Sequence, residues 1–225
     1  MLNGETDRYV REERYIRKNG TSVWCNLTLS LVIDDLDKPK YFIAVIEDIT
    51  ERKHLESELT RLARQDSLTG AFNRQHFLKM AEREFERARR YKHPLAVLML
   101  DVDHFKLVND HHGHLVGSQT LRQLSQVLGQ CVRQVDTLAR YGGDEFTILL
   151  RDVISVDDSV AVAGRIADAL REPVEVDGNE FVITPSIGIA TYPEDGTDID
   201  SLVANADMAM YQAKERGKNR VEFAG

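Results

Sequence analysis

Apolar residues follow two different spacings along this chain, and the change of spacing separates an N-terminal sheet from the rest of the sequence. Between residues 9 and 50 the apolar positions fall in short runs rich in β-branched and aromatic residues, at 21–33 and 40–50. Polar, turn-forming residues stand before each run, beginning with Asn19-Gly20. This pattern predicts strands. No long helical pattern precedes them, so residues 1–50 look like the second half of a sheet domain.

Helical spacing begins at Glu51. Leu55, Leu59 and Leu62 are four and three residues apart among Glu and Arg, which predicts a connecting helix over 51–65. Such a seam would let the helix pair with a second copy of itself. A single amphipathic helix resting on a domain would show the same spacing, and the pattern leaves both interpretations open.

Residues 66–225 alternate helical and strand patterns and predict one domain of the α+β class. A central mixed or antiparallel sheet covered by helices is expected, because hairpins and helix-connected strands occur together. Helices are predicted over 75–92, 115–133, 156–170 and 198–217. Strands are predicted over 94–103, 181–192 and 220–224, with a hairpin over 136–152.

Composition limits the cellular compartments and the classes of binding partner that are expected. The net charge of −8 disfavours broad binding to the phosphate backbone of nucleic acids, so no nucleic-acid partner is expected. No apolar run is long enough to cross a membrane, and a secretory leader is not expected. Cys25 and Cys131 form neither a metal-binding spacing nor a disulfide framework, which indicates a cytoplasmic protein.

Two pairs of acids mark candidate chemistry. Asp101 and Asp103 end an apolar run, and Asp144 and Glu145 follow two glycines at the tip of the predicted hairpin. If the strand and the hairpin are neighbours, the carboxylates converge on an oxygen site suited to Mg²⁺, which would support in-line attack on the α-phosphate of a nucleotide. Solvent-exposed acids at the ends of strands would show the same sequence pattern. The spacing alone does not decide between a metal site and such exposed acids.

Three lysines are available to hold phosphates. Lys106 lies in a predicted turn that begins at Phe105, where backbone N–H groups would face phosphate. Lys214 and Lys218 are four residues apart and share one face of the last helix. Two lysines on a helix are, taken alone, usually a solvated surface.

Four stretches resemble, in order and spacing, the landmarks of the GGDEF family of diguanylate cyclases. They are DSLTGAFNR (66–74), DVDHFKLVNDHHGHLVGS (101–118), RYGGDEF (140–146) and YQAKERGKNR (211–220). The resemblance implies a sheet like that of nucleotide cyclases and polymerase palms, whose diglycine bend presents acids to metal and substrate. It also implies a bacterial signalling enzyme that condenses two GTP into cyclic di-GMP and releases pyrophosphate.

The resemblance further implies a role for each matching residue. Mg²⁺ (or Mn²⁺) would be held by Asp101, the Val102 carbonyl and Asp144, with Glu145 beside them. Asp144, or a base near it, would help to deprotonate the 3′-hydroxyl of one nucleotide. Each subunit would hold one nucleotide, so turnover would require a homodimer. The residues implied to contact the nucleotide are Phe105, Lys106, Asn109, Ser118, Lys214 and Lys218, and Lys106 is also expected to act in catalysis.

Two further resemblances lie outside the catalytic motifs. RQVD at 133–136 matches the family's inhibitory site, where Arg133 would grip the cyclic dinucleotide product and Asp136 the guanine edge. An ordinary exposed arginine and aspartate is the alternative, because two fixed positions in four are common by chance. Residues 1–50 resemble the C-terminal half of a PAS domain, so the chain is expected to be a fragment whose sensor ligand the sequence does not identify.

Two positions depart from the family pattern. Lys218 stands where arginine is usual, which keeps the charge but loses the two-pronged hydrogen bonding of a guanidinium. Ser118 stands where an aspartate usually pairs with guanine. A carboxylate only accepts hydrogen bonds and suits the donors of guanine, whereas a hydroxyl both donates and accepts. Serine here resembles a promiscuous subset of the family, so ATP is expected as a second substrate and 3′,3′-cyclic GMP–AMP as a second product.

Two other classes of function remain open. A catalytically inactive relative could serve as a receptor for a nucleotide or cyclic di-GMP, although both glycines and all the acids of the hairpin are present. A structural signalling partner that dimerises through 51–65 would explain the leucine spacing but not the acids and lysines.

Overall fold

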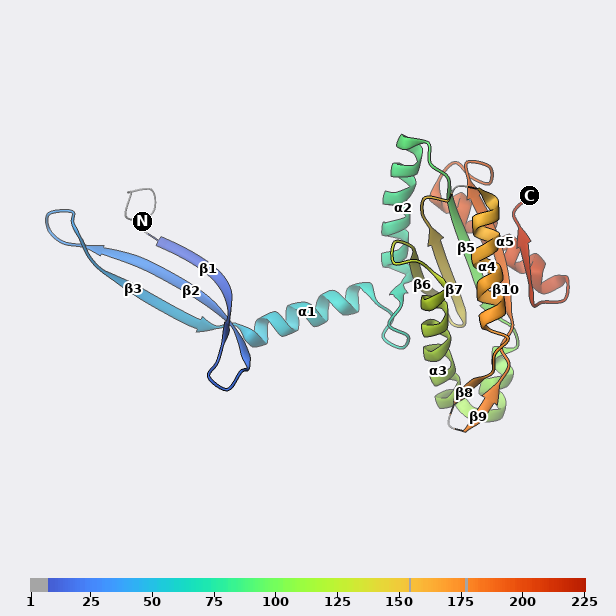
Figure 1. Cartoon of the computed structure of the whole chain (residues 1–225), viewed down its shortest axis with the longest axis horizontal. Coiled ribbons are helices and arrows are strands. Elements are labelled where there is room, and N and C mark those ends of the chain that lie inside the picture. Colours follow the sequence, from blue (N-terminus) through green and yellow to red (C-terminus); the bar gives the residue numbers. More distant parts are fainter. Residues whose placement is uncertain (1–7, 154, 177) are drawn as a thin grey trace. The chain divides into compact units, whose positions relative to one another are not determined.

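The computed structural model describes residues 8–153, 155–176 and 178–225 (Figure 1). The chain divides into two compact units between Arg61 and Leu62. Within the described ranges, none of the helices combines the length and the apolar character that a bilayer crossing requires.

The N-terminal unit is an antiparallel meander whose strands neighbour one another in chain order. Its strands are β1 (Arg8–Ile16), β2 (Ser22–Ile33) and β3 (Pro39–Asp48). Every residue of β3 is exposed, and in β2 only Val23 and Cys25 are buried. A three-stranded sheet with so little core is expected of a domain represented by only part of its strands.

One residue separates helix α1 (Thr50–Arg64) from the end of β3. The Thr50 hydroxyl accepts a hydrogen bond from the Trp24 backbone N–H, and the Asp48 carboxylate accepts one from the Thr50 N–H. None of the α1 residues is buried. Leu55, Leu59 and Leu62 are all more than half exposed, so the leucine stripe covers nothing within the described part of the chain.

The C-terminal unit is built on a six-stranded sheet in the order β11-β10-β5-β7-β6-β4. Its central strands are antiparallel, whereas β4 runs parallel to β6 and β11 parallel to β10. The mixed α+β sheet predicted from the sequence is therefore confirmed. The elements are β4 (Phe72–Asn73), α2 (Arg74–Tyr91), β5 (Leu95–Val102), α3 (Phe105–Cys131), β6 (Thr137–Gly142), β7 (Glu145–Leu150), α4 (Val156–Ala169), β8 (Val174–Val176), β9 (Asn179–Phe181), β10 (Pro185–Tyr192), α5 (Ile199–Glu215) and β11 (Arg220–Phe223).

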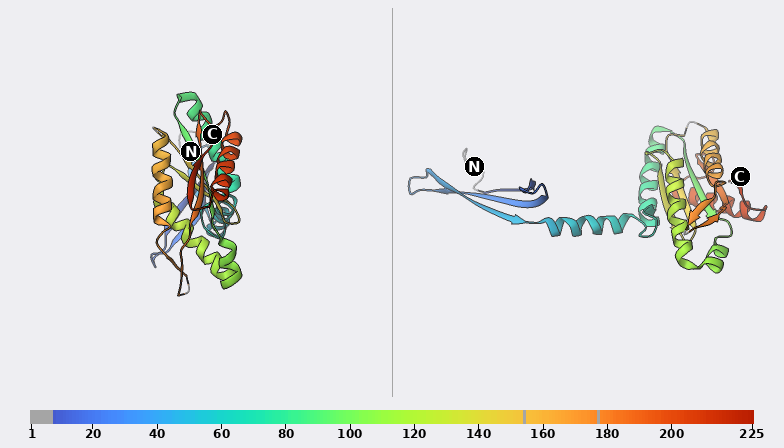
Figure 2. Two further views of the ribbon diagram at one scale, coloured as in Figure 1. Left: turned by 90° about the vertical axis from the view of Figure 1, so that its right-hand side faces the viewer. Right: turned by 60° about the horizontal axis from the view of Figure 1, so that its bottom comes forward.

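Helices cover both faces of this sheet (Figure 2, left). Alternate residues of β5 belong to two separate clusters, because side chains of a strand point to opposite faces. Leu95, Val97 and Met99 pack with α2 and α5, whereas the even-numbered positions pack with α3 and α4. All eight residues of β5 are buried, as the uninterrupted apolar run predicts for a central strand.

One close approach seats α5 on the sheet. A Cβ placed on Gly188 of β10 would lie 2.0 Å from the Ala206 carbonyl oxygen and 2.2 Å from the Met210 backbone nitrogen. Both atoms belong to the backbone of α5, so only glycine allows this helix to pack at the observed depth.

The structure differs from the sequence prediction before β10 and at the start of α3, among other places. The strand predicted over 181–192 is interrupted: β9 ends at Phe181, and β10 begins only at Pro185, which has no N–H for a preceding ladder bond. The turn predicted at Phe105-Lys106 is instead the first turn of α3, which runs to Cys131 with a kink at Gly113 (φ 84°).

Candidate active site

The two acid pairs meet at one edge of the sheet. Strand β5 pairs with β7 in the register Asp101↔Glu145, so these residues face each other across neighbouring strands. Both lie on the face that α2 and α5 cover, in continuation of Met99 and Thr147. Asp144 precedes Glu145 at the tip between β6 and β7.

Arg140 holds the tip in shape. Its guanidinium donates to the Gly143 carbonyl from Nε (2.9 Å) and Nη2 (2.6 Å), and Nη1 contacts the Asp66 carboxylate at 3.1 Å. Gly143 has φ 48°, a conformation that glycine adopts without strain. Burial alone would raise the pKa of Asp66, but hydrogen bonds from Thr69 and Arg140 outweigh it and lower that pKa. The bend is thus fixed by a partly buried ion pair to the segment that follows α1.

The Val102 carbonyl points towards the same tip. Asp103 donates its backbone N–H to the Thr184 carbonyl, so at this position β5 bonds to β10. Successive residues of an antiparallel strand direct their backbone N–H and C=O to opposite sides. The N–H and C=O of Val102 are therefore directed away from β10, towards β7. The pairing of β5 with β7 stops at Asp101↔Glu145, which leaves Val102 beside the bend that carries Asp144.

Lys214 on α5 completes this edge. Its Nζ lies 2.7 Å from Oδ2 of Asp101, whose side chain is 12% exposed. Burial raises the pKa of Asp101, and the charges of Asp144 and Asp103 add to the rise, whereas Lys214 opposes it. Burial also raises the pKa of Glu145, helped by the charges of Asp101 and Asp207. Negative charge is therefore concentrated here beyond what one lysine balances.

A cavity of about 430 Å³ adjoins the acidic tip on its other side. That volume falls within the range of small-molecule sites, roughly 300–1,000 Å³. Its lining includes Phe105, Lys106, Asn109, Ser118 and Asp144, five of the residues predicted to contact nucleotide or metal, together with Leu68, Asp110, His114, Leu121, Arg140 and Gly143.

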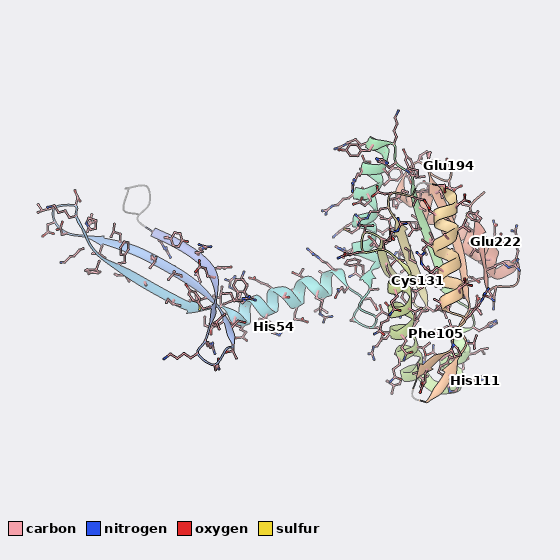
Figure 3. The ribbon with its side chains drawn as sticks, viewed as in Figure 1. His54, Phe105, His111, Cys131, Glu194 and Glu222 are labelled. Atoms are coloured by element: carbon pink, nitrogen blue, oxygen red, sulfur yellow. The ribbon has the colours of Figure 1, made fainter. Side chains whose placement is uncertain are left out.

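The two halves of α3 shape the cavity. Phe105 and His111, both labelled in Figure 3, lie in the short segment before the Gly113 kink. A Cβ on Gly117, in the second segment, would lie 2.0 Å from Oδ1 of Asn109. Gly117 thus lets the two segments close on each other and leaves the Asn109 amide lying against backbone in the cavity wall.

Lys218 lies apart from the cavity lining. Its Nζ is 3.3 Å from Nε2 of His104, the residue that precedes α3. It sits in the turn after α5 rather than on the helix, because α5 ends at Glu215. The shared helix face expected for Lys214 and Lys218 is therefore wrong: Lys214 contacts Asp101, and Lys218 contacts His104.

Asp103 also departs from expectation. It follows β5 at the same edge as Asp101, but its carboxylate accepts hydrogen bonds from Ser186, Thr184 and the backbone of Asn219. The sequence pattern placed Asp103 with Asp101 as a candidate for metal binding, because both acids end the same apolar run.

The RQVD segment forms a tight turn before β6. Oδ2 of Asp136 accepts from the Arg133 N–H at 2.8 Å, and Asp136 donates its own N–H to the Arg133 carbonyl. Oδ1 of Asp136 accepts from the Arg151 N–H at 3.3 Å. The Arg133 side chain is exposed. The aspartate thus already shapes the turn that would present the arginine to a ligand.

The oxygen donors at the acidic edge fit Mg²⁺ or Mn²⁺. Among the described residues, no group of three or more His, Cys, Asp and Glu side chains is arranged to hold an ion unaided. Mg²⁺ typically takes only one or two carboxylates and completes its shell with water and substrate phosphates. Asp101, Asp144 and the Val102 carbonyl supply that incomplete set, and the Lys214 ammonium at Asp101 shows that a cation is accommodated there.

Comparison with known proteins agrees with this geometry. The family model described as "Diguanylate cyclase, GGDEF domain" matches residues 63–220. The chain belongs to the GGDEF family. A PAS domain model matches residues 3–51, so the GGDEF domain is preceded by part of a PAS domain.

Relatives and solved structures of this GGDEF protein span several bacteria. An uncharacterized signaling protein of Caulobacter vibrioides is 38% identical over 185 residues, which are 80% of this chain and 22% of the relative. The bifunctional diguanylate cyclase/cyclic di-GMP phosphodiesterase MucR of Pseudomonas aeruginosa is 39% identical over 162 residues, 72% of this chain and 24% of MucR. The chain therefore spans about a quarter of the length of these relatives.

Two solved GGDEF structures superpose well. The GGDEF domain of TpbB (YfiN) from Pseudomonas aeruginosa has a TM-score of 0.70 and 36% identity, covering 72% of this chain and 94% of that one. The coiled coil and GGDEF domain of DgcB from Caulobacter crescentus, solved in complex with c-di-GMP, has a TM-score of 0.70 and 29% identity, covering 77% and 92%.

Proposed function

We propose that this protein is a dinucleotide cyclase, which joins two purine nucleoside triphosphates into a cyclic dinucleotide and releases two pyrophosphates. One observation carries the proposal: Asp101 and the Asp144-Glu145 bend meet at one sheet edge, with Lys214 on one side and a nucleotide-sized cavity on the other. We place the reaction in the cytoplasm, where GTP and ATP are available. Family membership and the intact acids support enzymatic activity over a purely structural role.

A divalent ion is the proposed cofactor. Mg²⁺ or Mn²⁺ held by Asp101, Asp144 and the Val102 carbonyl would neutralise phosphate charge and favour the in-line displacement. Glu145 stands beside this set, opposite Asp101.

The side chains of the protein bind the nucleotide and move one proton. Lys106, exposed at the start of α3, and Lys214 offer ammonium groups to the triphosphate. Asn109 and Ser118 contact the base, and buried Phe105 supports their wall of the cavity. A carboxylate at the tip, Asp144 in this proposal, takes the proton from the 3′-hydroxyl. The 3′-oxygen then bonds to the α-phosphorus of the second nucleotide, and the bond from that phosphorus to pyrophosphate breaks.

Two copies of the chain are required because one cavity holds one nucleotide. A homodimer would bring two such cavities face to face, so that each 3′-hydroxyl meets the other α-phosphate. The exposed leucine stripe of α1 offers a seam for this pairing. Arg133 and Asp136 are the proposed product-binding site, and the cyclic dinucleotide bound there would slow turnover. Lys218 is proposed as a third phosphate contact, beside Lys106 and Lys214.

Ser118 is proposed to relax the choice of base. Sites that match donors and acceptors strictly discriminate by about 10⁴–10⁵-fold, and an aspartate supplies such a match to guanine. A hydroxyl tolerates the acceptor at adenine N1 as well as the donor at guanine N1. We therefore expect 3′,3′-cyclic GMP–AMP from GTP plus ATP, beside cyclic di-GMP from GTP alone.

The test is product analysis with purified protein, Mg²⁺ and equimolar GTP and ATP, with pyrophosphate release followed in parallel. Cyclic di-GMP and the mixed dinucleotide are both expected, and Ser118→Asp should restore guanine preference. Cyclic di-GMP alone would refute the relaxed selectivity while keeping the cyclase. Nucleotide or cyclic dinucleotide binding without pyrophosphate release would refute the cyclase and establish a receptor.

A further inference from the structure

Asp103 carries three hydrogen bonds that come from two separate segments of the C-terminal unit. Its Oδ1 accepts from the Ser186 hydroxyl at 2.7 Å, and its Oδ2 accepts from the Thr184 hydroxyl at 2.9 Å. The third bond, also 2.9 Å, comes to Oδ2 from the backbone N–H of Asn219. The residue is only 7% exposed. A carboxylate so placed is satisfied by fixed donors rather than by water.

The turn that Asp103 contacts, between α5 and β11, contains backbone in an unfavourable conformation. Lys218 and Asn219 both lie in the left-handed region, with φ 63° and 46°. Non-glycine residues adopt this conformation at an energetic cost, so two in succession need outside support. Asp103 supplies it at Asn219, and the Lys218 N–H bonds to the Ala213 carbonyl.

Two phosphate-binding lysines depend on this turn. Lys214 lies in the last turn of α5 and reaches Asp101, and Lys218 lies in the turn itself. Immediately afterwards Arg220 enters β11, paired with Ser186. Ser186 of β10 therefore both donates a hydrogen bond to Asp103 and pairs with the first residue of β11. Asp103 ties the end of α5 to the sheet at the point where the catalytic acids emerge.

We propose that Asp103 is a positioning residue that latches the α5–β11 turn and so fixes Lys214 and Lys218 for the triphosphate, rather than a ligand of the metal. This inference rests on the proposed cyclase function. It separates two acids that are only two residues apart: Asp101 acts on metal and lysine, and Asp103 acts through hydrogen bonds alone.

The amide substitution distinguishes the two roles. In Asp103→Asn the side-chain oxygen can keep its bonds from Thr184 and Asn219, and the Ser186 hydroxyl can turn round and accept from the new NH₂ group. The latch survives although the charge is gone. Asp103→Ala removes all three bonds. For a metal ligand, by contrast, loss of the charge would be damaging in either variant.

Steady-state kinetics with the full chain give the first readout. Asp103→Ala should raise KM for GTP by about 10- to 100-fold, as a displaced binding group does, with the Mg²⁺ concentration for half-maximal activity unchanged. Asp103→Asn should stay within about threefold of the wild type. Asp101→Asn serves as the matched comparison and should lower kcat and shift the Mg²⁺ dependence. If Asp103→Asn is as damaged as Asp103→Ala and shifts the Mg²⁺ dependence, the latch is wrong.

A second variant and a second measurement keep the test independent of folding and turnover. Thr184→Val combined with Ser186→Ala leaves the carboxylate in place but removes two donors, and should raise KM in the same way. Hydrogen–deuterium exchange over 214–220 should accelerate in this variant and in Asp103→Ala, but not in Asp103→Asn. If the wild type is active and exchange over 214–220 is unchanged in both variants, the positioning role of Asp103 is refuted and the cyclase function is not. Absence of cyclic dinucleotide from the wild type would refute the proposed function, while the exchange pattern would still decide the latch.

Discussion

Gly188→Ala should strongly destabilise the C-terminal unit, although it adds only one methyl group. The added Cβ would lie 2.0 Å from the Ala206 carbonyl oxygen, whereas ordinary contact begins at 3.4 Å. Helix α5 would have to move away by roughly the 1.4 Å difference, and its buried residues would lose contact with the sheet. Overpacking against backbone that cannot rotate aside is expected to cost about 3 kcal/mol. For a domain of this size that corresponds to a fall of roughly 6–12 °C in Tm.

Circular dichroism melting of the whole chain measures the effect, and Gly164→Ala supplies the control. Gly164 lies within α4, and a Cβ there would meet no heavy atom within 4 Å. Alanine in that helix should stabilise the fold by about 0.5–1 kcal/mol, because glycine loses more backbone entropy on folding. The two substitutions add the same atoms and should move Tm in opposite directions.

Displacement of α5 should also lower activity. Because α5 carries Lys214, whose Nζ lies 2.7 Å from Asp101, any movement of the helix should weaken triphosphate binding. If Gly188→Ala melts within 2 °C of the wild type (roughly 1 kcal/mol at most), the close packing of α5 on β10 would be disproved.

Two further substitutions test the site. Gly117→Ala places a Cβ 2.0 Å from Oδ1 of Asn109, so it should displace that amide and raise KM for nucleotide by about tenfold, while Gly129→Ala on the same helix should leave KM unchanged. Folding raises the pKa of Glu145 above the ordinary value of about 4.3. Between the unfolded and the folded pKa, the folded chain therefore binds more protons than the unfolded chain. The contribution of this carboxyl to stability falls as the pH rises through that interval. Glu145→Gln should therefore increase Tm near neutral pH, lose the increase near pH ~4, and reduce turnover; an equal Tm difference at both pH values would contradict the assignment.

Apolar spacing and motif order predicted the main elements, because each depends on local pattern. The buried strand at Leu95 and the hairpin around the two glycines carry their own signals in uninterrupted apolar residues and in glycine. The break before Pro185 was missed because Val182 and Ile183 extend the apolar run, although Pro185 is itself a signal against one continuous strand. The start of α3 was missed because Gly113 interrupts the helical spacing, and the structure absorbs that glycine as a kink.

The site was less predictable than the fold. Asp103 and Asp101 have the same chemistry and adjacent alternate positions, and only the three-dimensional placement of Ser186, Thr184 and Asn219 separates their environments. Arg140 was overlooked although it stands two residues before the glycines; its contact with Asp66 joins residues 74 positions apart. Asp207, whose charge helps to raise the pKa of Glu145, could have been predicted to lie near the site. It lies seven residues before Lys214 and therefore on the same face of α5.

The ion pair between Arg140 and Asp66 sets a boundary for protein engineering. One guanidinium joins Asp66, just after the connecting helix, to the carbonyl of Gly143, next to Asp144 and Glu145. A chimera that exchanges the N-terminal PAS part should therefore be spliced within α1, no later than Arg64. A junction a few residues further on would remove Asp66, so Arg140 at the Asp144-Glu145 bend would lose its ion pair whichever N-terminal domain was attached.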